Sequence, residues 1–184
     1  MTWCQTFTGK RFDYARTMPD MVDIEDIARA LSMQCRFNGH VSEFYSVAQH
    51  SVHVAAHLGH LPPKGRLQGL LHDATEAYIG DVVRPLKRLM PIYAIIEERV
   101  WLAVCEHFDI TEVMHPDVLK ADEQMLIREA MDLLPVDILA EWDENEGPSE
   151  LVASITPLDP GRAERLFMMS YRALAREISN GTTT

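Results

Sequence analysis

The chain has 184 residues, a net charge of −11, and 47% hydrophobic against 24% charged residues, which indicates one globular domain over residues 1–184 with a sizeable core. So acidic a chain is a poor candidate for non-specific binding to long nucleic acid, and we expect no such partner. No apolar run approaches the ~20 residues that cross a bilayer, so we expect no membrane partner either. The first residues show no secretion signal and the three cysteines are scattered, so we expect free thiols and a cytoplasmic protein.

The N-terminal segments predict a short hairpin and a first helix. Alternating side chains around the turn Thr8-Gly9-Lys10 favour a β-hairpin over residues 2–13, and a loop follows over residues 15–21. Asp23 is a typical N-cap, and the apolar spacing after it predicts a helix over residues 24–34.

The next helix carries a candidate metal ligand. Ser42 or Ser46 caps it, and it runs to about Leu58, before Pro62-Pro63 stops it. His50 lies on the flank of its core stripe, which is made of Val47, Ser51, Val54 and Leu58.

A helix is predicted from about Lys64 to Tyr78, and it contains the dipeptide His72-Asp73. Gly80 ends this helix, residues 81–85 form a loop, and a short helix runs from Pro85 to Leu89. Apolar residues at helical spacing mark the face toward the core, namely Leu67, Leu70, Leu71 and Ala74.

The rest of the chain is also helical in pattern. We expect long helices over residues 93–108 and 115–132, a short helix over 136–142, a polar excursion over 143–160 and a last helix over 160–178. No internal repeat and no alternation of strands with helices is present. The fold class is therefore all-α, a compact orthogonal helical bundle with a short N-terminal β-hairpin.

His72 and Asp73 stand at the edge of an apolar helical face, where burying them without partners is costly. A divalent cation suits both side chains, and His50 and Asp122 are further ligands of the right type on other predicted helices. His, His, Asp and Asp with water suit a first-row divalent ion such as Co²⁺, Mn²⁺ or Zn²⁺, or Mg²⁺. The ordinary alternatives are a core-edge imidazole bonded to a carbonyl at position 50 and a first-turn helix carboxylate at position 122.

Two carboxylates and two cations surround the candidate ligands in sequence. Glu76 lies one helical turn beyond His72 and can orient or deprotonate a water, while Asp81 is a second candidate for a base. Arg36 and Lys87 are candidates for holding phosphate, and Arg84 and Arg88 lie next to Lys87. The alternatives are a surface Glu, an Asx-turn Asp after Gly80, and solvated surface charges.

Several segments, in this order along the chain, resemble the bacterial 5′-deoxynucleotidases of the HD superfamily. They resemble still more closely the small HD phosphohydrolases that include the dATP triphosphohydrolases of phages that exclude adenine from their DNA. The similarity covers roughly residues 5–130, which is far more specific than one His-Asp pair. The segments are Arg36-Phe37, Ser46 to Ser51, Leu71 to Asp81, Pro85-Leu86-Lys87 and Ala121-Asp122.

The resemblance implies an HD-type fold and cleavage of the bond between the α-phosphorus and the 5′-oxygen. It implies that Glu76 and Asp81 act on the water or the leaving group, that Arg36 and Lys87 hold phosphate, and that residue 37 packs on the sugar or base. The deoxynucleotidases have Trp after that Arg, whereas this chain has Phe37. We also expect a homo-oligomer in the cytoplasm of a bacterium or a phage-infected host. The implied metal ligands are His50, His72, Asp73 and Asp122.

The loop Arg36-Phe37-Asn38-Gly39 suggests the substrate. A ring at Phe37 leaves little room for a 2′-hydroxyl and favours stacking of a purine, and Asn38 can contact the edge of adenine. We therefore expect a small deoxynucleotide, with dATP leading. The alternatives are a 5′-deoxynucleotidase of monophosphates, an HD enzyme of another phosphoester, and a non-catalytic HD-like nucleotide-binding module.

Overall fold

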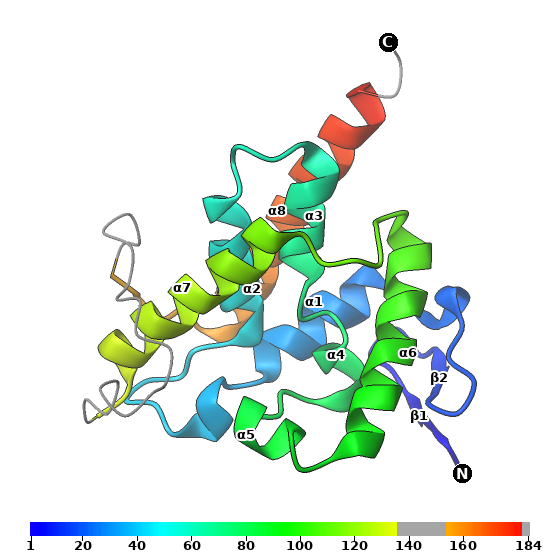
Figure 1. The fold of residues 1–184 in the computed structure, drawn as a ribbon. Helices are drawn as coiled ribbons and strands as arrows, with labels where there is room; N and C mark the ends of the chain where they lie inside the picture. Colours follow the sequence, from blue (N-terminus) through cyan, green and yellow to red (C-terminus); the bar gives the residue numbers. More distant parts are fainter. Residues whose placement is uncertain (136–153, 182–184) are drawn as a thin grey trace.

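The computed structural model describes residues 1–135 and 154–181, and these residues are mostly helical with one small sheet (Figure 1). The strands β1 (Trp3–Gln5) and β2 (Arg11–Asp13) pair antiparallel, with Cys4 opposite Phe12. The helices are α1 (Ile24–Met33), α2 (Val47–His57), α3 (Pro63–Leu71), α4 (Glu76–Ile79), α5 (Arg84–Lys87), α6 (Pro91–Phe108), α7 (Pro116–Leu133) and α8 (Pro160–Gly181), with 3₁₀ turns at Pro19–Met21 and Phe37–Gly39.

Helix α2 lies at the centre of the packing. One face of α2, with Val47, Ala48 and Ala55, joins a large apolar cluster with α1, α3, α6 and α8. Val54 and the C-cap residue Leu58 join a second cluster with α7. Because α1, α3, α7 and α8 all pack against α2, His50 in the middle of this helix has no exposed surface. The largest fully buried side chains of the two clusters include Phe12, Ile27, Leu31, Leu70, Leu71 and Phe167 in the first and Tyr45, Leu58 and Met125 in the second.

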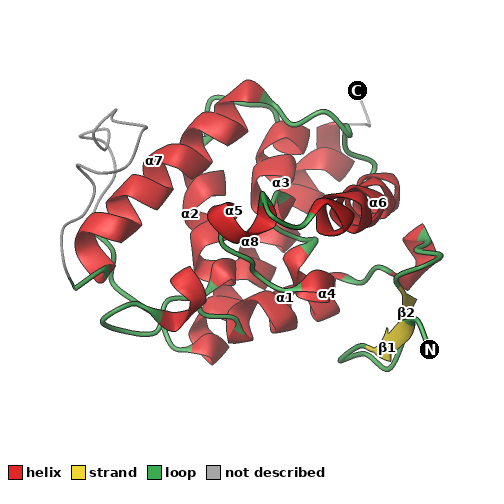
Figure 2. Ribbon diagram, turned by 60° about the horizontal axis from the view of Figure 1, so that its bottom comes forward, coloured by secondary structure: helices red, strands yellow, loops and turns green. Residues whose placement is uncertain are grey.

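The helix starts follow the capping residues of the sequence. Asp23 accepts a hydrogen bond from Glu25 N at α1, Ser46 accepts one from Gln49 N at α2, and Asp159 accepts one from Arg162 N at α8. These side chains satisfy amide groups that have no partner within the helix. The predicted hairpin and helical bundle are confirmed at this level, and the hairpin lies at one edge of the bundle near α6 (Figure 2).

The prediction of one helix over residues 64–78 is wrong. Helix α3 ends at Leu71, residues 72–75 form a tight turn, and α4 begins at Glu76. The imidazole of His72 donates from Nδ1 to Gly69 O, the carbonyl that the amide of residue 73 would use in a continued helix. The side chain thus competes with the backbone and breaks the helix at the His-Asp pair.

Close packing of α3 on α2 depends on Gly69. A Cβ atom at this position would lie 2.2 Å from Leu58 Cδ1, so a larger residue would force the buried Leu58 side chain to move. This approach brings the end of α3, with His72, beside the middle of α2, with His50.

Other boundaries differ by a few residues from the sequence expectations. Helix α6 begins at Pro91, α5 covers Arg84–Lys87, and α8 extends to Gly181, while a 3₁₀ turn interrupts the loop over residues 15–21. The short helix expected over 136–142 and most of the polar excursion lie outside the described residues. Within residues 1–135 and 154–181, none of the helices combines the length and apolarity needed to cross a membrane.

Candidate metal centre and active site

A cavity of about 540 Å³ opens between α5 and α7, and it has the size of a small-molecule site. Both ribbon views place α5 between α6 and α7, so α5 forms one wall and α7 the other (Figures 1 and 2). Five acidic and four basic residues line the cavity, together with Phe37, Val82, Val83, Pro85, Leu126 and Ile127. The charged residues are Asp73, Glu76, Asp81, Asp122 and Glu123, and Arg36, Arg84, Lys87 and Arg88.

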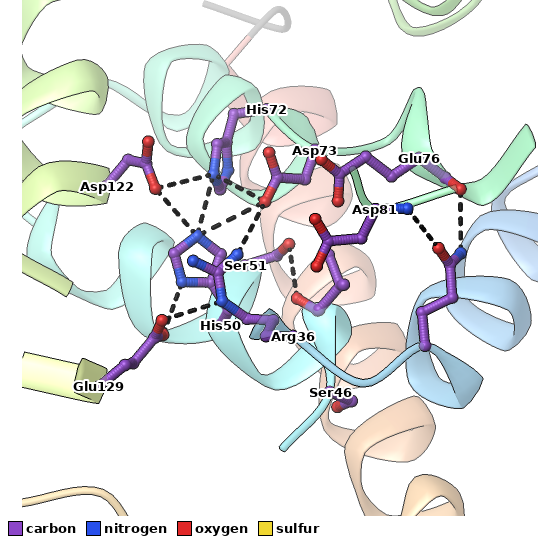
Figure 3. Close-up of polar contacts among 12 residues, drawn as sticks. Arg36, Ser46, His50, Ser51, His72, Asp73, Glu76, Asp81, Asp122 and Glu129 are labelled. Carbon is purple, nitrogen blue, oxygen red and sulfur yellow. Dashed lines mark hydrogen bonds and ion pairs between the residues drawn. The ribbon is translucent and has the colours of Figure 1, made fainter. Parts of the chain in front are cut away.

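The imidazoles of His50 and His72 lie next to the carboxylates of Asp73 and Asp122 (Figure 3). The two carboxylates also line the cavity. The Nε2 atoms of His50 and His72 are 3.2 Å apart. Asp122 Oδ1 lies 3.1 Å and 3.8 Å from these two nitrogens, and Asp73 Oδ2 lies 3.5 Å and 3.2 Å from them. Ligands held about 2.0–2.3 Å from one ion lie roughly 3–4 Å apart, so these separations suit a shared cation.

The tautomers of the two histidines also fit a metal ion. His72 Nδ1 donates to Gly69 O at 2.8 Å, and His50 Nδ1 donates to Glu129 Oε1 at 2.7 Å. A carbonyl oxygen only accepts, so the proton of a neutral His72 is on Nδ1 and the lone pair is on Nε2. The lone pairs of both Nε2 atoms therefore face each other and the carboxylate oxygens. A divalent ion between these electron-rich atoms would stabilise the arrangement.

The four candidate ligands are not equivalent. The ligand atoms of His50, His72 and Asp122 all lie within 4.8 Å of one another and form a group that could hold a metal ion. Asp73 is not part of this mutual group, and it lies on the other side of the imidazoles from Asp122 (Figure 3). Asp73 touches both histidines and lines the cavity, so it is placed to complete the set from the cavity side.

The ionisation of the cluster shows how strongly its members interact. Burial alone would raise the pKa of Asp122, but contacts with His50 and His72 lower it well below its usual value. Burial alone would lower the pKa of His72, but Asp73 and Asp122 raise it well above its usual value. Positive charge is thus strongly favoured at the point where the four side chains meet.

Glu129 is a site residue that the sequence reasoning missed. It has no exposed surface, and besides accepting from His50 it accepts from Arg36 Nε at 2.9 Å. A carboxylate behind a ligating histidine fixes its tautomer and orientation. The available signal was its spacing: Glu129 follows Asp122 by seven residues on α7, two helical turns along the same face.

Arg36 is therefore more than a surface cation. Its side chain is about 10% exposed, and besides the bond to Glu129 its Nη1 lies 3.5 Å from Asp73 Oδ2. It ties the support of His50 to a second candidate ligand, and it still lines the cavity, where a phosphate can reach it. The expected contact of Arg36 with phosphate stays a prediction. The structure adds a second role, in which Arg36 holds the carboxylates of Glu129 and Asp73 in place.

The two predicted catalytic carboxylates both line the cavity. Glu76 is 5% exposed, its Oε1 is 3.2 Å from Lys87 Nζ, and its Oε2 has no hydrogen-bond partner among the described residues. Burial raises the pKa of Glu76, and neighbouring Asp73 and Asp81 raise it further. Burial likewise raises the pKa of Asp81. Both groups can hold a proton closer to neutral pH than an exposed carboxyl can.

Gln34 holds the backbone of these two carboxylates together. Its Nε2 donates to Glu76 O at 2.9 Å, and its Oε1 accepts from Asp81 N at 2.8 Å. The amide thus spans the turn at Gly80, whose φ of +86° suits glycine. Sequence reasoning placed Gln34 at the end of a helix, where it is the C-cap residue of α1, and gave it no role at the site.

Lys87 lies between two carboxylates. Its Nζ is 2.8 Å from Glu97 Oε1 on α6, in addition to the contact with Glu76. Glu97 was not expected at the site, because no local pattern links it to α5. Arg84 Nη2, by contrast, reaches across the cavity to Asp122 Oδ2 at 2.7 Å.

The loop expected to bind the sugar and base divides into two parts. Phe37 lines the cavity, and its ring centre is 5.7 Å from the guanidinium carbon of Arg36. Asn38 and Gly39 are exposed and are not among the cavity-lining residues. Phe37, Asn38 and Gly39 all have positive φ, at 55°, 52° and 78°. A bulky residue in this region is strained, and such strain concentrates at functional sites.

No family model matches the chain. Over 176 residues the chain is 41% identical to the uncharacterized protein YfdR of Escherichia coli (strain K12), and the match covers 95% of this chain and 97% of that protein. It is also 32% identical over 126 residues to an uncharacterized protein of Rhodobacter capsulatus, which is 65% of this chain and 64% of that protein. A match of this length includes the cavity-lining residues, which lie between positions 36 and 127.

Proposed function

We propose that this chain, which belongs to the same family as YfdR of Escherichia coli, is a metal-dependent phosphohydrolase of the HD type that acts on 2′-deoxynucleotides. The leading substrate is dATP, which would give deoxyadenosine and triphosphate. The observation that carries this proposal is the convergence of His50, His72 and Asp122, with Asp73 beside them, at a cavity lined by cations. The ions that suit this donor set are Co²⁺, Mn²⁺, Zn²⁺ and Mg²⁺.

Different side chains around the cavity can carry out different steps of the hydrolysis. When bound, a divalent ion would supply Lewis acidity toward a phosphoryl oxygen and toward water. Glu76 Oε2 is buried and without a hydrogen-bond partner in residues 1–135 and 154–181, so it can accept a proton from the attacking water. The water oxygen then bonds to the α-phosphorus and the bond to the 5′-oxygen breaks. Asp81 can supply the proton that the 5′-oxygen needs to leave as a hydroxyl.

The cavity also supports the proposed substrate class. Phe37 offers an aromatic face, and the apolar side chains Val82, Val83 and Leu126 line the same cavity. A base and a sugar can pack on these surfaces while phosphate lies toward the charged groups. The same features also accommodate a deoxynucleoside monophosphate, so 5′-deoxynucleotidase activity is the second candidate.

A panel of nucleotides tests the proposal. Mono- and triphosphates of deoxyadenosine, deoxyguanosine, deoxycytidine and thymidine, with AMP and ATP, are incubated with Mn²⁺, Co²⁺, Zn²⁺ or Mg²⁺, and products are resolved by chromatography. We expect deoxynucleoside release, fastest from dATP and slower from ATP. Metal binding without turnover of any of these nucleotides would contradict the proposal and favour a non-catalytic binding module. Equal rates for the four bases would remove the preference for adenine.

A further inference from the structure

Most of the positive charge on the cavity wall is already engaged. Of the four cations that line the cavity, three lie close to carboxylates. These pairs are Arg36 with Glu129 at 2.9 Å, Arg84 with Asp122 at 2.7 Å, and Lys87 with Glu97 at 2.8 Å. Any anion that bound these groups would have to compete with a carboxylate that already holds them.

Arg88 is different. It lines the same cavity, its residue is exposed, and its side chain makes no ion pair with any residue that the structure describes. It follows the last residue of α5 as the C-cap, where its amide donates to Arg84 O. Its guanidinium therefore keeps its donors for a ligand, and a planar fork of donors matches phosphate oxygens well.

The order of the cations along α5 gives Arg88 its place in the site. Arg84 contacts Asp122, so that end of α5 faces the candidate metal centre. Arg88 lies one helical turn further along, about 6 Å in axial distance. A ligand held at the centre would therefore have to extend along α5 to reach Arg88, as a chain of phosphates can and a single phosphate cannot.

We propose that Arg88 forms a subsite for the phosphates beyond the α-phosphate, so that it selects nucleoside triphosphates over monophosphates. This inference rests on the proposed function, because it takes the α-phosphate to lie at the metal centre. It adds Arg88 to Arg36 and Lys87, the two residues that the sequence analysis expects to hold phosphate, and gives Arg88 the contact with the outer phosphates. Lys87 instead spans Glu76 and Glu97 and belongs to the catalytic part of the site.

Calorimetric titration with inorganic tripolyphosphate and with inorganic phosphate measures this subsite without turnover. Wild type, Arg88→Ala, Arg88→Lys and the control Arg172→Ala are compared in a fixed excess of Mn²⁺, so that chelation is the same in every titration. Arg172 is an exposed arginine on α8 that does not line the cavity. We expect Arg88→Ala to weaken tripolyphosphate roughly tenfold and phosphate by less than about twofold, with partial recovery in Arg88→Lys.

The outcomes separate the subsite from the reaction. No tripolyphosphate binding by the wild type, an unchanged affinity in Arg88→Ala, or equal losses for phosphate and tripolyphosphate would each overturn the subsite. In parallel, kcat/KM for dATP should fall about tenfold more than kcat/KM for dAMP in Arg88→Ala. If the wild type hydrolysed neither nucleotide, the proposed function would fail, while the titrations would still decide whether Arg88 binds a phosphate chain.

Discussion

The two walls of the cavity are built differently. On the ligand wall, formed by α7 with α2 packed behind it, His50, Asp122 and Glu129 are held by short contacts, and the imidazole and the Glu129 carboxylate are fully buried. On the open wall, formed by α4 and α5, Glu76 has an unpartnered oxygen and Arg88 has no ion pair in the described part of the chain. One wall is preorganised by the protein itself, and the other keeps groups available for water and substrate.

The largest effect is expected on the ligand wall. Asp122→Asn removes the charged oxygen that lies 3.1 Å from His50 Nε2, and an amide oxygen is a much weaker ligand. We expect metal affinity to fall by more than about 100-fold and turnover to be lost with it. Calorimetric titration of the metal-free protein with Mn²⁺ measures the affinity. Asp117→Asn, a partly exposed position on the same helix that does not line the cavity, is the control and should bind metal normally.

On the open wall, Glu76→Gln should separate catalysis from metal binding. The amide fills the same space but cannot take the proton, so kcat should fall about 10²–10⁴-fold while metal affinity stays within a few-fold. Glu98→Gln, an exposed position on α6, is the control. Loss of metal binding in Glu76→Gln would show that Glu76 helps to bind the metal ion. Normal turnover would show that Glu76 is not the base and would leave Asp81 as the candidate.

A pair of substitutions at Glu129 tests how the ligand wall is held. Glu129→Gln keeps an acceptor for His50 Nδ1 but loses the charge that faces Arg36, so metal affinity should fall about 10–100-fold. Glu129→Ala also removes the closer of the two carboxylates beside the buried Arg36 and should cost about 3–5 kcal/mol of unfolding free energy. Urea unfolding and metal titration of both variants measure the two effects. Equal metal affinity in Glu129→Gln and wild type would show that Glu129 only stabilises the fold.

The contrast between the walls also explains which features the sequence predicts. The caps at Asp23 and Ser46, the end of a helix at Gly80 and the apolar stripes are local, because each depends on residues within one or two turns. The order of His50, His72 and Asp122 along the chain allowed a shared metal group to be expected, and the structure brings their ligand atoms together.

The missed features depend on distant contacts. Glu129 is 79 residues from His50 and 93 from Arg36, so no window of sequence contains the pair. The break of the helix at His72 arises from its bond to Gly69 O, which competes with the helical pattern that the sequence shows. The pairing of Lys87 with Glu97 requires α5 to fold back on α6, and helical periodicity carries no information about that turn.

The smallest predicted effect is the pH dependence of stability at Glu76 on the open wall. Its folded pKa is raised above the usual value of 4.5, chiefly by burial, so the folded protein holds this proton more tightly than the unfolded chain does. The resulting stabilisation is complete below the unfolded pKa and is lost as pH rises through the folded pKa. Glu76→Gln cannot ionise, so in the presence of a chelator it should be more stable than wild type near neutral pH. That advantage should shrink as pH falls toward about 5, as urea unfolding at several pH values would show. If the variant were less stable at every pH, the contact of Glu76 with Lys87 would outweigh the cost of burying its charge.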